Sequence, residues 1–228
     1  MAFCMALLAA CTGGPANVTP TAPSSRASNG SHLVPCTVRG DVQCGTVEVP
    51  LDRANPGGGS ISIEFYVHRH TDTSAPAAEP VFTTPGGPGS NGLGAMEFVL
   101  QIDTLLAHHD IVAIDPRGTG RSGAIECPDL QDGWADVREM NAAVRACGDH
   151  LGDAADRYGS GDVALDVEAV RRALGYDRID FYAFSYGSVP EQAYAARFPG
   201  RVHALVFDAG MSVTDPDHVW AWELGVPR

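Results

Sequence analysis

The chain has few basic residues for its size. Its 228 residues include 28 Asp and Glu but only 15 Lys and Arg, which gives a formal net charge of -13 at pH 7. Such a charge would repel the phosphates of a nucleic acid and the surface of an anionic membrane. We therefore expect neither as a binding partner, and we interpret the acidity as a feature that favours solubility.

The sequence also lacks a membrane-spanning run and a metal-type cysteine spacing. The apolar run at residues 1–11 is too short to cross a bilayer. None of the six cysteines forms a C-x-x-C pair, and no histidine accompanies them at ligand spacing. We therefore expect no metal site and no cofactor.

The N-terminus is similar to a bacterial lipoprotein signal. The segment Leu8–Cys11 (LAAC) matches a lipobox, although no Lys or Arg precedes it, and a chance apolar start is the alternative. Residues 12–35 are rich in Gly, Pro, Thr and Ser and predict a flexible linker. We expect a secreted protein or a cell-surface lipoprotein that contacts the membrane only through a lipid on Cys11.

The four cysteines outside the signal form two pairs that are close in sequence. Structural disulfides in an oxidising compartment are the favoured interpretation, and four free thiols in a cytosolic protein are the alternative. The pairs are Cys36 with Cys44 and Cys127 with Cys147.

The remaining chain, residues 36–228, reads as one α/β domain. With 44% hydrophobic residues it has enough apolar side chains for a core. A Pro- and Gly-containing turn separates two alternating strands, and buried strands then alternate with helices. We expect one helix across residues 93–105, a helix capped by Asp162, and a disulfide-tied insertion with short helices at 124–161. The predicted strands are 46–49, 61–67, 81–83, 111–114, 179–184 and a buried strand at 202–207.

Ser185 stands between a strand and a helix. Ala183 and Gly187 flank it at two residues' distance, which gives the small-residue pattern A-x-S-x-G of a nucleophile elbow. In that geometry the serine hydroxyl lies above the sheet, and the Tyr186 N–H at the helix start can stabilise an oxyanion. The alternative is a turn that merely ends a strand.

Two loops follow strands that precede the elbow. The run TPGGPGS at 84–90 can present backbone N–H groups as an anion-binding nest, although an ordinary Gly-Pro turn is the alternative. The run DPRGTGRS at 115–122 lies at the carboxyl edge of the predicted sheet. We expect Asp115 and Arg117 to form an ion-paired corner that supports the site.

Taken in order, these motifs resemble the N-terminal half of exported α/β-hydrolases of the prolyl-aminopeptidase and tripeptidyl-aminopeptidase family. The resemblance implies an α/β-hydrolase fold, a mostly parallel sheet with helices on both faces. It also implies that Ser185 forms an acyl-enzyme with a peptide or a small ester, with Tyr186 and Gly87 supplying the oxyanion hole. It is carried by 44–58, 85–90, 115–122, 184–187 and 196–210.

The chain departs from that family after the elbow. Such enzymes place an acid and then a histidine after later strands. Here His203 opens the next strand, His218 follows it too soon, and Asp208 is at most a variant acid. We therefore expect a C-terminally truncated domain that lacks the cap and the last core strands. Either the chain is a fragment of a serine aminopeptidase or related esterase, whose other half is missing from this sequence or is a partner on another chain, or it is a non-catalytic surface lipoprotein that acts as a binding module.

Overall fold

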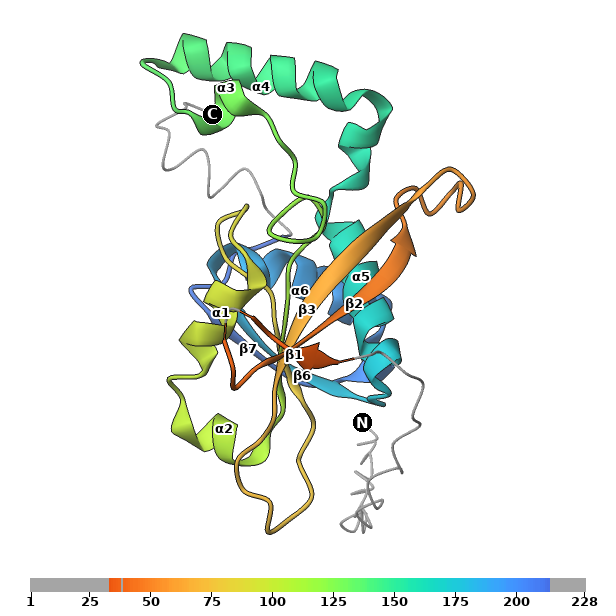
Figure 1. Cartoon of the computed structure of the whole chain (residues 1–228), viewed down its shortest axis with the longest axis vertical. Coiled ribbons are helices and arrows are strands. Elements are labelled where there is room, and N and C mark those ends of the chain that lie inside the picture. Colours follow the sequence, from red (N-terminus) through yellow and green to blue (C-terminus); the bar gives the residue numbers. More distant parts are fainter. Residues whose placement is uncertain (1–32, 38, 214–228) are drawn as a thin grey trace, which may run out of the picture.

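Figure 1 shows the computed structural model, which describes residues 33–37 and 39–213. The expectations for the lipobox at Cys11, for His218 and for most of the linker lie outside the described residues. Within the described part of the chain, no helix is long and apolar enough to span a membrane.

The core is a seven-stranded mixed sheet of order β1-β2-β3-β5-β4-β6-β7. The first three strands pair antiparallel, β3 joins β5 antiparallel, and β5-β4-β6-β7 run parallel. The parallel strands therefore end at one edge, where α/β proteins form their ligand sites. The strands are β1 (Val34–Pro35), β2 (Gln43–Pro50), β3 (Ser60–His68), β4 (Val81–Thr83), β5 (Ile111–Ile114), β6 (Ile179–Phe184) and β7 (Val202–Asp208).

Strand β1 corrects the expected linker boundary. Val34 and Pro35 pair with Cys44 and Gln43 of β2, so the folded domain begins before residue 36. The disulfide between Cys36 and Cys44 joins the same two segments. The short β1 strand is thus attached to the sheet by backbone pairing and by a covalent bond.

Helices cover both faces of the sheet. Helices α5 (Ser160–Leu174) and α6 (Ser188–Arg197) lie on one face, where Val167 and Tyr194 pack in one cluster with Phe181 of β6. Helix α1 (Gly92–Val99) lies on the other, with Met96 buried against a second cluster. The fold is therefore the α/β arrangement predicted from the sequence.

Two helix boundaries differ from the prediction. The expected helix across 93–105 is divided into α1 and α2 (Asp103–His108), because Gln101 and Ile102 bond three residues back and the chain leaves the helix axis. Helix α5 is capped by Gly159, so Asp162 lies in its first turn rather than at the cap. An acidic residue still favours the positive end of the helix dipole there.

The insertion contains a longer helix than expected. After α3 (Pro128–Gln131), helix α4 (Val137–Leu151) has 15 residues, followed by η1 (Gly152–Arg157). Asp136 caps α4 by accepting hydrogen bonds from the first amides of the helix. The disulfide between Cys127 and Cys147 ties the two helices into one arm. This arm stands beyond the carboxyl ends of the parallel strands (Figure 1).

Strand β7 is not the buried strand that the sequence predicts. It pairs with β6 alone and forms an edge of the sheet, and most of its residues are exposed, including Val206 and Phe207 at 52% and 44%. The prediction rested on the apolar run, because such a run is typical of a strand that helices cover on both faces and that has a strand on each side. Among the described residues β7 has a neighbour on one side only, and its outer backbone groups can accept another strand.

Candidate active site

The elbow turn places Ser185 in a conformation that non-glycine residues rarely adopt. Ser185 follows β6 directly, has a φ of +51° and opens the turn Ser185–Gly187 that leads into α6. Its side chain is partly exposed at the carboxyl edge of the sheet. A serine held at positive φ needs surroundings that enforce it, and such strain is concentrated at functional sites.

Gly187 explains why the turn is so tight. A Cβ at this position would come well within 3.0 Å of the carbonyl oxygen of Thr84. Thr84 is the first residue after β4, and its hydroxyl donates a hydrogen bond of 3.0 Å to the Gly187 carbonyl. The elbow and the start of the glycine loop are therefore in direct backbone contact, and only glycine fits between them.

The glycine loop lies against the serine. A Cβ on Gly86 would be 3.4 Å from the Ser185 Cβ, and Gly87 follows with a φ of +114°. Sequence reasoning singled out Gly87, whereas the structure brings Gly86 next to the serine. The Tyr186 hydroxyl bonds to Ser160 Oγ at 2.9 Å, so its side chain is held at the start of α5.

Ser188 and Gln192 of α6, which the sequence analysis did not single out, hold the elbow in place through hydrogen bonds. Ser188 Oγ donates to the Ser185 carbonyl at 2.7 Å and accepts from the Met211 N–H at 2.8 Å. Gln192 donates to the Met211 carbonyl at 2.7 Å. These bonds attach the segment after β7 to the elbow helix. In the sequence, only the position of Ser188 three residues after Ser185 pointed to its role in holding the elbow.

Asp115 is a buried acceptor that organises the loop after β5. Its carboxylate accepts hydrogen bonds from the Gly92 N–H (2.6 Å), the Arg121 N–H (2.7 Å) and the Tyr66 hydroxyl (3.0 Å). A Cβ on Gly120 would collide with this carboxylate, which accounts for the glycine in DPRGTGRS. Burial, followed by the charge of Asp115, raises the pKa of the Tyr66 hydroxyl, which stays a donor.

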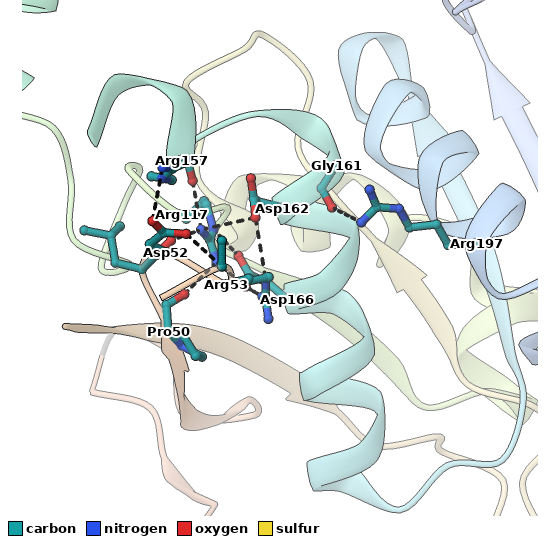
Figure 2. A network of polar contacts seen from close by, with 11 residues as sticks. Pro50, Asp52, Arg53, Arg117, Arg157, Gly161, Asp162, Asp166 and Arg197 are labelled. Carbon is teal, nitrogen blue, oxygen red and sulfur yellow. Dashed lines mark hydrogen bonds and ion pairs between the residues drawn. The ribbon is translucent and has the colours of Figure 1, made fainter. Parts of the chain in front are cut away.

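Arg117 does not pair with Asp115, so the predicted ion-paired corner is wrong in its partner. Arg117 instead forms a two-bond ion pair with Asp166 of α5, at 2.7 and 2.8 Å, and both side chains are fully buried. Figure 2 shows the pair within a larger network that includes Arg53 and Asp162. Backbone N–H groups of Gly92 and Arg121 already occupy the Asp115 carboxylate, and Arg117 finds its partner on α5.

The network anchors the loop to helix α5 and to the end of β2. The Arg117 guanidinium donates to the carbonyls of Leu51 (3.0 Å) and Arg157 (2.8 Å). Burial raises the pKa of the Asp166 carboxyl, and the guanidinium groups of Arg117 and Arg53 oppose that shift. The network has a structural role, because its charged groups pair with one another.

The glycine loop borders a cavity of about 470 Å³, whose lining includes Phe184 but not Ser185. The backbone of the glycine loop forms one wall, and aromatic side chains of α1 and β6 form the other. Phe98 and Phe184 stack with ring centroids 5.1 Å apart, and Tyr182 lies 6.1 Å from Phe98. The lining residues include Thr84, Gly86, Gly87, Phe98, Tyr182 and Phe184.

Comparison with known proteins agrees with this geometry. The sequence profile of the family described as alpha/beta hydrolase fold matches residues 79–226. The chain belongs to the α/β-hydrolase family.

Three relatives of this α/β-hydrolase are informative. It is 30% identical over 201 residues to a tripeptidyl aminopeptidase of Streptomyces lividans, covering 78% of this chain and 37% of that protein. It is 32% identical over 219 residues to the serine protease Hip1 of Mycobacterium tuberculosis, covering 87% and 40%. It is 29% identical over 190 residues to carboxylesterase B of Mycobacterium tuberculosis, covering 74% and 36%. The chain thus spans about two fifths of the length of these relatives.

The described histidines of this α/β-hydrolase lie away from Ser185. His203 lies near the start of β7, at the amino-terminal ends of the parallel strands, and its Nδ1 atom is 2.7 Å from Asp180 Oδ1. Asp208 ends β7 next to Phe184, but its carboxylate accepts a hydrogen bond from Tyr182 at 2.9 Å. Among the described residues, Ser185 Oγ has no hydrogen-bond partner. Within the described residues, no hydrogen bond therefore joins Ser185 to a general base.

Substitution of Gly187 tests the contact between the elbow and the glycine loop. We expect Gly187→Ala to lower the free energy of unfolding by about 1–3 kcal/mol or more, because the new methyl group must displace the Thr84 carbonyl. Gly200→Ala is the matched control, because nothing lies within 4 Å of its Cβ. Urea unfolding of both variants measures the difference, and equal stability of the two would contradict the contact.

Substitution of Arg117 tests the buried network. We expect Arg117→Ala to lower the free energy of unfolding by about 3–5 kcal/mol, because it leaves the buried Asp166 carboxylate poorly compensated. Arg138, whose side chain is 94% exposed beside Asp136, is the control, and its alanine variant should change stability by less than about 0.5 kcal/mol. A similar small effect at both positions would show that the network does not stabilise the fold.

Proposed function

We propose that the chain carries the nucleophile of a serine peptidase that releases residues or short peptides from a free N-terminus. The single observation that supports this most strongly is Ser185, held at positive φ beside the glycine loop at the carboxyl edge of the sheet. The names of the relatives, a tripeptidyl aminopeptidase and a serine protease, favour a peptide substrate.

In the proposed reaction, Ser185 Oγ attacks the carbonyl carbon of the scissile bond while its proton moves to a general base. The Tyr186 N–H and an N–H of the glycine loop, at Gly87 or Gly86, bind the resulting oxyanion. Each such donor contributes roughly 3 kcal/mol in the transition state. The base then protonates the leaving amine, the C–N bond breaks, and water hydrolyses the acyl-enzyme on Ser185.

The acid and the base belong, in this proposal, to a C-terminal half that completes the site. Strand β7 offers an open edge beside the elbow, and Phe207 and Val206 expose apolar surface there. A further strand that pairs parallel with β7 would bring its carboxyl end to the same edge as Ser185. Asp208 keeps the lesser role of a variant acid, since Tyr182 already occupies its carboxylate.

A carboxylic-ester hydrolase is the second candidate. The carboxylesterase among the relatives favours it, because ester and peptide hydrolysis share the serine, the oxyanion hole and the acyl-enzyme. A non-catalytic surface protein that binds a partner through the open edge is the remaining alternative. For localisation, we propose an exported protein anchored through Cys11. The two disulfides support export, because such bonds persist in oxidising compartments.

Labelling with a fluorophosphonate probe tests the nucleophile. Any adduct should lie at Ser185, as located by peptide mass spectrometry, and should disappear in Ser185→Ala. Ser74→Ala, an exposed serine in a distant loop, should label like the original chain. An adduct elsewhere, or undiminished labelling of Ser185→Ala, would contradict the assignment. No adduct on a folded sample would exclude activity of these residues alone and place the base in another segment.

A further inference from the structure

Glu191 is a buried carboxyl group that the proposed reaction does not use. It lies on the first turn of α6, one turn after the elbow, and its side chain is fully buried. Its Oε1 atom accepts a hydrogen bond of 3.0 Å from the Thr84 N–H and lies 3.0 Å from Thr84 Oγ. Its Oε2 atom has no hydrogen-bond partner among the described residues.

The hydrogen atoms available at Thr84 constrain the protonation state of Glu191. Thr84 Oγ carries one hydrogen, and the Gly187 carbonyl, 3.0 Å away, can only accept. If Thr84 Oγ donates to Gly187, its contact with Glu191 Oε1 needs a hydrogen on the carboxyl group. A neutral acid completes the chain, because Glu191 then donates to Thr84 and Thr84 donates to Gly187.

Within the part of the chain that the structure describes, no cation influences the pKa of Glu191. Helix α5 faces α6 with Glu168 and Arg171, which pair with each other, and Tyr194 of α6 donates to Glu168. At the end of β7, Asp208 is engaged with Tyr182. Burial raises the pKa of the Glu191 carboxyl well above its ordinary value of 4.5, and the hydrogen bond from the Thr84 N–H only partly opposes this. An unpaired carboxylate at this depth would be strongly unfavourable.

We infer that Glu191 is a neutral positioning residue that fixes the glycine loop against the elbow through Thr84. Thr84 precedes Pro85, Gly86 and Gly87, so a shift of Thr84 moves the loop that lies against Ser185. The contribution to catalysis rests on the proposed function, whereas the protonation state does not. The two parts therefore need separate measurements.

The first measurement is the pH dependence of stability, which needs no activity. A carboxyl group that is neutral in the folded state and ionised in the unfolded state makes the folded state lose stability as pH rises above 4.5. This loss continues up to the pKa of the folded state. Relative to Glu191→Gln, the unfolding equilibrium constant of the original chain should therefore rise about tenfold per pH unit across that interval.

The comparison is made by urea unfolding of the full chain at several values between pH 5 and 8. The amide side chain of the Glu191→Gln variant can itself change stability by an amount that does not depend on pH. This effect cancels, because the comparison uses only how the stability difference between the two proteins changes with pH. Glu126→Gln, at an exposed position, is the control and should show no such trend. If the difference in the free energy of unfolding between Glu191→Gln and the original chain does not change with pH, Glu191 is not neutral in the folded state.

The second measurement is the fluorophosphonate labelling rate of Ser185. We expect Glu191→Ala to slow labelling at least tenfold at pH 7 and Glu191→Gln, which keeps the shape and neutrality, to restore most of the rate. Equal labelling of the Ala and Gln variants with the original chain would overturn the positioning role. If the original chain does not label, these residues have no activity alone and the positioning role is overturned for this chain, while the stability series still decides the protonation state.

Discussion

The close approach of Gly187 to the carbonyl of Thr84 is the constraint on which the site depends. It joins the end of β4 to the turn after β6, two strands that are adjacent in the sheet although some hundred residues separate them in the chain. Because no side chain fits between the two backbones, the glycine loop lies directly beside Ser185. The nucleophile and the proposed oxyanion donors thus share one backbone contact.

Supporting interactions hold the same edge from three directions. Asp115 joins the loop after β5 to the start of α1, Arg117 joins it to α5, and Ser188 joins the elbow to the segment after β7. None of these groups is free for chemistry, since each is engaged with backbone or with an opposite charge. Together they hold the carboxyl edge of the sheet in one rigid arrangement.

The sequence was sufficient for the features that depend on local pattern. The alternation of Ile179, Phe181 and Ala183 located β6, and Gly187 located the elbow. It failed where the outcome depends on distant neighbours. The apolar run of β7 gave no sign that the strand is an exposed edge. The closeness of Asp115 and Arg117 in sequence suggested an ion pair, whereas Arg117 pairs with Asp166 of α5. Glu191 carried no signal at all, because only the fold brings Thr84 to it.

The fold also explains why the proposed reaction depends on a base from another segment. The parallel strands and α6 deliver the serine and its amides, but in the described residues the histidines lie near the opposite edge or on the α4 arm. A serine peptidase needs a base within hydrogen-bond reach of the hydroxyl. The open edge of β7 is the place where a further strand could supply it, and this edge is the main structural argument for a second half.

In the proposed site, the elbow and the glycine loop together form an oxyanion hole beside Ser185. A crystal structure of the Ser185 phosphonate adduct tests this proposal most directly. We expect the phosphonyl oxygen to lie about 2.7–3.1 Å from the Tyr186 nitrogen and from a backbone nitrogen of the glycine loop. A phosphonyl oxygen that points to solvent, with neither nitrogen in reach, would contradict it.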